Sequence, residues 1–264
     1  MITALAISSQ VVRGHVGNSA AGPAMRMLGV QTWCLPTVVL SNHPGHGAAA
    51  GLTIPATEMA CMLDTLDQHG WLDQVNGVLS GYIAHRDQVQ VIADAVRRIK
   101  QRNPGVVYAC DPVIGDTPKG RYVDVEVAEG IREVLLPLAD LITPNHYELG
   151  WLSRSTPGDR DSTLRCARAL GCERVLVTST PARNMHRLGT MLVSAGSVHE
   201  VETQRLSRVP NGCGDLLAGL LFGCLLLGLE DSVALSRASN HLQRILHASV
   251  AAGSDELLLS PQLD

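Results

Sequence analysis

The sequence has few aromatic residues, 3% of its 264 positions, and it lacks a long uninterrupted apolar run. The scarcity of aromatics excludes the stacking platforms that single-strand nucleic-acid binders use. Its longest apolar stretch, residues 216–229, is interrupted by glycines and is too short to span a bilayer. The first residues lack the basic region and long apolar segment of a secretory signal. We therefore expect neither a nucleic-acid nor a membrane partner.

Neither sign of charge dominates the chain: the formal net charge is −4, and the lysines and arginines are scattered along the sequence. The seven cysteines are odd in number and form no CxxC pair, so they indicate no disulfide framework. A reducing, cytoplasmic environment suits such thiols. Hydrophobic residues make up 45% of the chain, enough for a sizeable core. Because no repeat or low-complexity linker interrupts it, we expect one domain over residues 1–264.

Short β-branched stretches alternate with segments of helical periodicity. The predicted strands are residues 3–8, 31–40, 76–81, 105–110, 139–144 and 172–179, followed by an antiparallel pair at 189–195 and 197–203. The predicted helices are residues 18–29, 57–69, 86–102, 214–227 and 231–250. This alternation predicts right-handed crossovers and a mainly parallel sheet covered on both faces, that is, a three-layer α/β/α sandwich.

Polar side chains follow most of the predicted strands. In open α/β sheets ligands bind beyond the carboxyl ends of the strands, so these residues are candidates for a site. For any single strand end, an ordinary polar loop remains an equally open interpretation. The candidates at these ends are Ser8, Ser9, Tyr82, Asp111, Thr143, Asn145, Thr178 and Ser179.

Three acidic residues lie near two of these strand ends. Pro112 forces Asp111 into an extended backbone, which projects its carboxylate past the strand. Asp116 and Glu148 are placed to join it. Carboxylates near a phosphate-bearing ligand suit Mg²⁺, which takes one or two of them and keeps several waters. The alternative is that each acid is a solvated loop residue or a charge at a helix N-terminus.

The stretch VPNGCGD, residues 209–215, precedes the long apolar helix. Gly212 and Gly214 permit close backbone approach, and amides at a helix N-terminus bind anions. Asp215 would then lie beside the anion, where a carboxylate can deprotonate an attacking hydroxyl. The alternatives are an ordinary helix start capped by Asn211, and a reactive thiol at Cys213 whose pKa the helix N-terminus lowers.

Six motifs in order resemble those of pyridoxal kinases in the ribokinase-like superfamily, over roughly residues 3–250. They are AISSQVVRGHVGNSAA, VVLSNHPGHG, LSGY, CDPVIGD, ADLITPNHYELGWLS and GCGDLLAGLL. The resemblance implies a ribokinase-like fold and transfer of the ATP γ-phosphoryl group to the 5′-hydroxymethyl of pyridoxal, and often of pyridoxine or pyridoxamine. It also implies Mg²⁺, a monovalent cation and a homodimer.

The resemblance also implies a role for each matching residue. Asp215 would be the base, and the amides of Gly212, Cys213 and Gly214 would hold the transferred phosphate. The implied vitamin pocket consists of Ser9, His43, Pro44 and Tyr82, next to Asp215. The implied ATP and metal residues are Asp111, Asp116, Thr143, Asn145, Glu148, Thr178, Ser179, Val209 and Gly212.

Three positions depart from the family pattern. Pro44 replaces a threonine that usually helps to bind the vitamin, His46 replaces a common tyrosine, and Cys213 replaces a threonine or valine. His43 and His46 also form an H-x-x-H pair, but no third metal ligand is evident, and we expect loop histidines near the substrate. Two alternatives stay open: a hydroxymethylpyrimidine kinase of thiamine synthesis, and a non-catalytic vitamin B6-binding protein.

Overall fold

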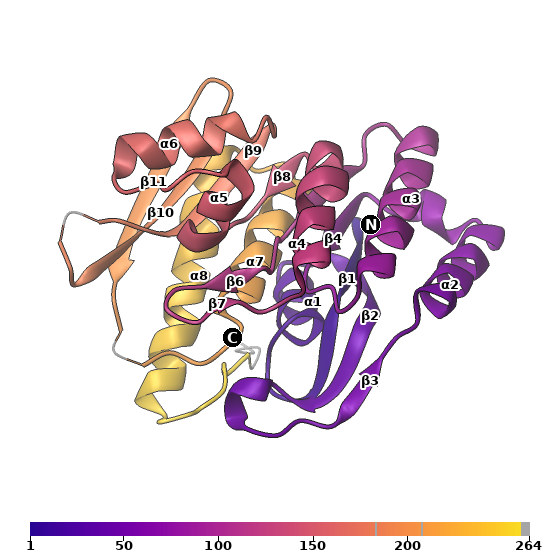
Figure 1. Ribbon diagram of the computed structural model, residues 1–264, viewed down its shortest axis with the longest axis horizontal. Coiled ribbons are helices and arrows are strands. Elements are labelled where there is room, and N and C mark those ends of the chain that lie inside the picture. The colour runs from indigo at the N-terminus through magenta and orange to yellow at the C-terminus, as the bar shows by residue number, and fades with distance from the viewer. Residues whose placement is uncertain (183, 207, 260–264) are drawn as a thin grey trace.

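A nine-stranded sheet forms the centre of the computed structural model, which describes residues 1–182, 184–206 and 208–259 (Figure 1). The strand order is β11-β10-β9-β8-β5-β4-β1-β2-β3. Strands β2, β1, β4, β5, β8 and β9 pair in parallel, whereas β3, β10 and β11 pair antiparallel to their neighbours. Their bounds are β1 Thr3–Arg13, β2 Gln31–Asn42, β3 Gly51–Thr53, β4 Gly77–Ser80, β5 Val107–Cys110, β8 Leu141–Ile142, β9 Arg174–Thr180, β10 Arg187–Ser194 and β11 Val198–Gln204.

Helices cover both faces of this sheet, and each face has its own apolar core. Side chains alternate along β1, with Leu5 and Ile7 in one core and Ala4 and Ala6 in the other. One face carries α2 (Ala56–Gln68), α3 (Arg86–Arg102), α4 (Val125–Gly130), α5 (His146–Ser153) and α6 (Arg160–Ala169). The opposite face carries α1 (Asn18–Met27), α7 (Cys213–Leu226) and α8 (Asp231–Ala251).

This architecture confirms the predicted three-layer α/β/α sandwich, and each predicted strand and helix is present. Strand β1 is longer than expected: it continues to Arg13 past an irregularity between Ser8 and Gln10, so Ser9 lies within the strand and not after it. Sequence periodicity missed the short elements, which are β3, α4, α6 and the hairpin of β6 (Gly115–Asp116) and β7 (Gly120–Arg121). Across the described ranges, no helix is both long and apolar enough to cross a membrane.

Helix α7 is apolar on all sides, and residues 216–224 are buried between the sheet and its neighbouring helices. A helix that is hydrophobic all round belongs in a core. Its N-terminus is therefore held rigidly at the edge where the parallel strands β1, β4, β5, β8 and β9 end.

Candidate active site

Two carboxylates lie together at this edge. Asp111 follows β5, and its N–H continues the sheet by donating to the Ser80 carbonyl at 2.7 Å. Its Oδ1 accepts a hydrogen bond from the Thr143 hydroxyl at 2.8 Å. Asp215 lies in the first turn of α7. Both acids line a cavity of about 10 Å³, enough for about one water molecule.

Enclosure raises the pKa of both acids. Burial, followed by repulsion from Asp215, raises the pKa of Asp111 to about 7, although the Thr143 hydroxyl opposes the shift. Burial raises the pKa of Asp215 to about 6, and hydrogen bonding from the Gly17 N–H opposes it. The two acids titrate as one coupled pair close to neutral pH.

Asn18 contributes a third oxygen to the same cavity. Its Nδ2 donates to the carbonyls of Ser8 and Leu35, both at 3.0 Å, which directs its Oδ1 away from them. This Oδ1 is buried and has no partner among the described residues. A buried acceptor without a protein partner requires a donor such as a water or a hydroxyl proton. Sequence reasoning missed Asn18 because it marks an ordinary helix start.

Residues 212–214 at the start of α7, called the cradle below, are the candidate anion-binding amides. Gly212 has φ +88°, and a Cβ there would lie 1.8 Å from the His15 carbonyl oxygen, so only glycine fits. The first amides of α7 have no partner within the helix and lie at its positive end. Asn211 does not cap this helix, which overturns the alternative of an ordinary asparagine cap.

Gly17 lies between Ser9 of β1 and Asp215 in the first turn of α7. Its N–H lies beside the Asp215 carboxylate and lowers the pKa of that acid, and its φ of +53° precedes the first turn of α1. A Cβ on Gly17 would lie 2.2 Å from Ser9 Oγ, so the Ser9 hydroxyl lies directly against this glycine. Ser9, Gly17 and Asp215 thus form a continuous row of contacts.

Cys213 has the properties of a buried thiol. Burial and the nearby Asp215 charge raise its pKa to about 12, and its Sγ donates to the Pro210 carbonyl at 3.1 Å. The idea that the helix N-terminus activates this cysteine is therefore wrong, because desolvation outweighs the helix dipole.

Glu148 is 5% exposed, and its carboxylate is occupied by backbone groups. Its Oε1 accepts from the N–H of Ile114 at 2.9 Å and of Gly115 at 3.3 Å, and its Oε2 accepts from Asn145 at 2.8 Å. Burial and the charge of Asp111 nevertheless raise its pKa to about 8. These contacts hold the β6–β7 hairpin against α5.

Asn145 supports the same hairpin. It caps α5 by accepting from the Glu148 N–H at 3.0 Å, and its Nδ2 donates to the Gly115 carbonyl at 2.7 Å. Asp116, within this hairpin, has an Oδ1 that is buried without a partner in the described structure. A carboxylate oxygen without a protein partner is the type of ligand that a hydrated divalent cation accepts.

The predicted vitamin-pocket residues come from three neighbouring segments. The Tyr82 N–H donates to Ser8 Oγ at 3.0 Å, which places Tyr82 beside the irregularity in β1. His43 begins a short turn, Pro44–His46, and its Nδ1 accepts from the Gly45 N–H at 3.0 Å. Burial, followed by repulsion from His46 and Lys119, lowers the pKa of His43.

The His43 and His46 ring centroids lie 6.4 Å apart, and His46 Nε2 contacts Glu256 at 2.8 Å. The residues that the structure describes contain no cluster of three or more metal-binding His, Cys, Asp or Glu side chains.

The predicted nucleotide residues lie farther along the same edge. The Thr178 N–H donates to the Pro144 carbonyl at 3.0 Å, which joins the end of β9 to the start of α5. Ser179 adopts a left-handed backbone with φ +57°, uncommon for a residue that is not glycine. Val209 is 47% exposed just before the cradle. These three residues border an open surface next to Asn145.

Comparison with known proteins gives concordant results. A family model described as phosphomethylpyrimidine kinase matches residues 63–259. The chain is 36% identical to a pyridoxal kinase of Corynebacterium diphtheriae and 38% identical to one of Leifsonia xyli, each over 97% of this chain and 92% of the relative. A solved pyridoxal kinase from Leishmania donovani, in complex with ADP and pyridoxine, superposes with a TM-score of 0.88 at 30% identity, covering 97% of this chain and 90% of that one.

Proposed function

The chain belongs to the phosphomethylpyrimidine kinase family and, within it, to the pyridoxal kinases, and on this premise we propose how its residues carry out the reaction. The protein uses ATP to phosphorylate B6 vitamers, with the 5′-hydroxymethyl group of pyridoxal as acceptor. The observation that carries the assignment of residues is the pair Asp111 and Asp215, which line one cavity beside the glycine cradle.

Asp215 is the base that takes the proton from the attacking hydroxyl. Its pKa of about 6 supports this role, because at neutral pH it is ionised and still close enough to the operating pH to accept a proton. The orphaned Oδ1 of Asn18, in the same cavity, accepts a hydrogen bond from the entering hydroxyl or from a water beside it.

The amides of Gly212, Cys213 and Gly214 bind the phosphoryl group as it moves. Positioning and charge stabilisation are most of what a protein contributes to phosphoryl transfer, and helix amides supply both without reorganisation. The buried α7 supports this role, since it prevents the cradle from shifting.

Asp111 and Asp116 would hold Mg²⁺, which supplies charge neutralisation of the ATP phosphates when bound. Glu148 keeps the β6–β7 hairpin in place, because its oxygens already accept three backbone hydrogen bonds. Thr143 orients Asp111, and Asn145 orients the hairpin. Thr178, Ser179 and Val209 would line the nucleotide side.

Ser9, His43, Pro44 and Tyr82 would line the vitamin side. The lowered pKa of His43 supports a neutral imidazole there; its Nδ1 accepts from the Gly45 N–H, which leaves the Nε2–H as a donor. Pro44 has no side-chain donor. We therefore propose that groups near Pro44 make the hydrogen bond that a threonine would make at this position.

The assay uses purified protein, ATP and Mg²⁺, with pyridoxal, pyridoxine, pyridoxamine or hydroxymethylpyrimidine as acceptor. Phosphorylation of a B6 vitamer is the expected result. Hydroxymethylpyrimidine as the preferred acceptor would favour the alternative that the family's description suggests. No product from any acceptor would leave a vitamin-binding protein without catalysis.

Three further assignments complete the proposal. One nine-stranded sheet built from residues 3–204 supports a single catalytic domain over residues 1–264. Seven free thiols support a reducing, cytoplasmic location. The resemblance to pyridoxal kinases supports a homodimer and a monovalent cation, which sedimentation and salt dependence of turnover would test.

A further inference from the structure

Residues 254–259 follow α8 and are fixed to the body of the protein. Leu257 and Leu259 are 0% and 9% exposed and belong to the core on the α7–α8 face. Ser249 Oγ accepts from the Leu258 N–H at 2.9 Å, and the Ser254 N–H donates to the Ser249 carbonyl at 2.9 Å. This anchored stretch, the 254–259 segment, carries two adjacent acids.

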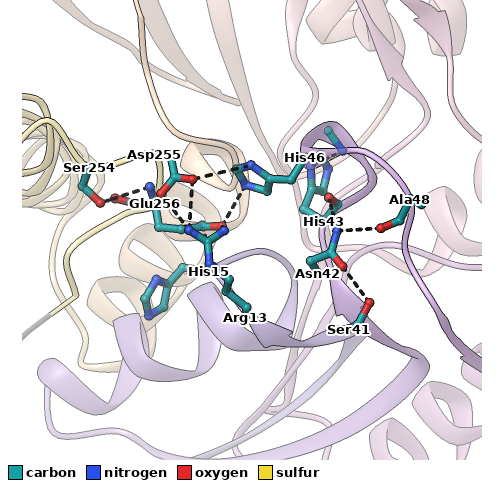
Figure 2. A network of polar contacts seen from close by, with 11 residues as sticks. Arg13, His15, Ser41, Asn42, His43, His46, Ala48, Ser254, Asp255 and Glu256 are labelled. Atoms are coloured by element: carbon teal, nitrogen blue, oxygen red, sulfur yellow. Dashed lines mark hydrogen bonds and ion pairs between the residues drawn. The ribbon is translucent and has the colours of Figure 1, made fainter.

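The two acids have different surroundings, as Figure 2 shows. Glu256 is 8% exposed; its Oε1 lies 2.8 Å from His46 Nε2 and 3.4 Å from Arg13 Nη1, and its Oε2 accepts from the His15 N–H at 3.2 Å. Asp255 is largely solvated; it binds Arg13 Nη2 at 2.9 and 3.0 Å, and its Oδ2 lies 3.8 Å from His46 Nδ1, a longer contact than that of Glu256. Only Glu256 reaches a backbone group of the loop beside the cradle.

The first set of contacts connects Glu256, through the 13–17 loop, to Asp215. The Glu256 carboxylate packs on Gly14, where a Cβ would lie 2.5 Å from Oε1, and it binds the next amide, that of His15. The carbonyl of His15 presses against Gly212 of the cradle. Two residues later, the Gly17 N–H lies beside the Asp215 carboxylate and lowers its pKa. Holding His15 therefore holds both the cradle and the base against each other.

The second set of contacts connects Glu256, through His46, to the 43–46 turn on the proposed vitamin side. His46 ends the short turn Pro44–His46, which begins next to His43. Within this turn, Gly45 lies close to the cradle, where a Cβ would be 3.1 Å from Asn211 Nδ2. Glu256 thus ties the 43–46 turn to the 13–17 loop across the mouth of the site.

We propose that Glu256 is a positioning residue for the kinase reaction, which holds the 13–17 loop and the 43–46 turn in register around Asp215 and the acceptor. The inference rests on the proposed function. It also explains the departure at His46: a tyrosine there would not offer Glu256 the same imidazole nitrogen. The carboxylate of Glu256 touches neither the cradle nor Asp215 and acts through His15 and His46.

The test compares Glu256→Ala with Asp255→Ala, adjacent acids that both bind Arg13. For Glu256→Ala we expect the KM for pyridoxal to rise about tenfold, the scale of a lost charged hydrogen bond, while the KM for ATP stays within about twofold. Asp255→Ala should keep both values. Glu256→Gln retains the shape and one acceptor, so its pyridoxal KM should fall between those of wild type and Glu256→Ala.

Hydrogen exchange of the unliganded proteins provides a readout that needs no catalysis. The amides of residues 13–17 and 43–47 should exchange faster in Glu256→Ala than in Asp255→Ala, while the strands and the thermal midpoint stay as in wild type. Unchanged exchange and an unchanged pyridoxal KM in Glu256→Ala would overturn the proposal, as would equal effects of the two alanine variants. If wild type phosphorylates no B6 vitamer, the proposed function fails, and the exchange data alone then decide whether Glu256 holds the two segments.

Discussion

The backbone N–H of Gly17 lies beside the carboxylate of Asp215 and lowers its pKa, so the N-termini of α1 and α7 meet at one acid. Both helix ends favour a negative charge there. They oppose the burial that would otherwise raise the pKa of Asp215 further. The proposed role of this carboxylate as a base requires that balance, because a base must be ionised near neutral pH and still be able to accept a proton.

Replacing Asp215 with asparagine removes the base and preserves its shape. Turnover should fall by about 10²-fold or more, a typical contribution of general-base catalysis, while ATP binding persists. Steady-state kinetics and nucleotide titration measure the two effects. Asp161→Asn, an exposed acid in the first turn of α6, is the matched control and should be silent. Turnover near wild type in Asp215→Asn would remove this residue from the mechanism.

The two cradle glycines should respond differently to alanine. Gly212→Ala combines a positive φ with a clash against the His15 carbonyl and should lower turnover by about 10²-fold through displacement of the cradle. A Cβ on Gly214 meets nothing within 4 Å, so Gly214→Ala should retain activity. Equal losses in both variants would contradict the assignment of backbone amides as the phosphate ligands.

Cys213→Thr should retain turnover, because the cysteine contributes its amide and not its thiol. Its high pKa keeps the sulfur protonated, and a hydroxyl can donate to the Pro210 carbonyl in its place. Kinetics and thiol alkylation check this expectation. A loss of turnover in the threonine variant, with an unchanged thermal midpoint, would restore a chemical role for the thiol.

Asp111→Asn should stabilise the unliganded protein, and more so at pH 8 than at pH 5. An unfolded aspartate has a pKa near about 3.9, whereas the folded value is about 7. Between these two pH values the folded state binds more protons than the unfolded state, so the free energy of unfolding falls as pH rises. Above about pH 7 the buried carboxylate is ionised, and its full destabilising effect is present. Asparagine removes that cost.

Thermal melts of the wild-type protein and the Asp111→Asn variant at both pH values measure this difference. A gain that is equal at both pH values would show that the effect comes from packing and not from charge. The variant should at the same time lose turnover, since Asp111 also serves the metal and the phosphates.

Asp116→Asn should raise the Mg²⁺ concentration needed for half-maximal turnover by about tenfold, the effect typical of altering a metal's carboxylate environment. Its orphaned Oδ1 is the reason, since an amide oxygen carries no net charge to a hydrated cation. Glu129→Gln, an exposed acid on the nearby α4, is the control. An unchanged Mg²⁺ requirement in Asp116→Asn would leave Asp111 as the metal carboxylate.

Much of the fold followed from periodicity, because strands such as β4 and helices such as α3 carry strong local patterns. Helix α3 spans Arg86–Arg102, as its apolar spacing predicts. The apolar run after VPNGCGD forms the expected buried helix. The shorter β6–β7 hairpin and α4 were missed, since two- to six-residue elements take their shape from tertiary contacts.

The chemistry of the site was less predictable than its location. No local pattern shows that Glu148 gives its oxygens to Ile114, Gly115 and Asn145, because that depends on a hairpin folding back on α5. The same holds for Glu256, whose partners His15 and His46 are more than two hundred residues away in the sequence. Contacts of this kind depend on how the helices and the sheet pack together, which no local sequence pattern shows.

The order of the layers along the chain has a consequence for synthesis. All nine strands of the sheet end by Gln204, before the cradle and α7 begin at Gly212 and Cys213. The ribosome makes the N-terminal part of a chain first, and a domain generally folds as a unit. A nascent chain that has completed its strands still lacks α7 and α8, so one face of its sheet has no complete core until the helix that carries Asp215 has been made.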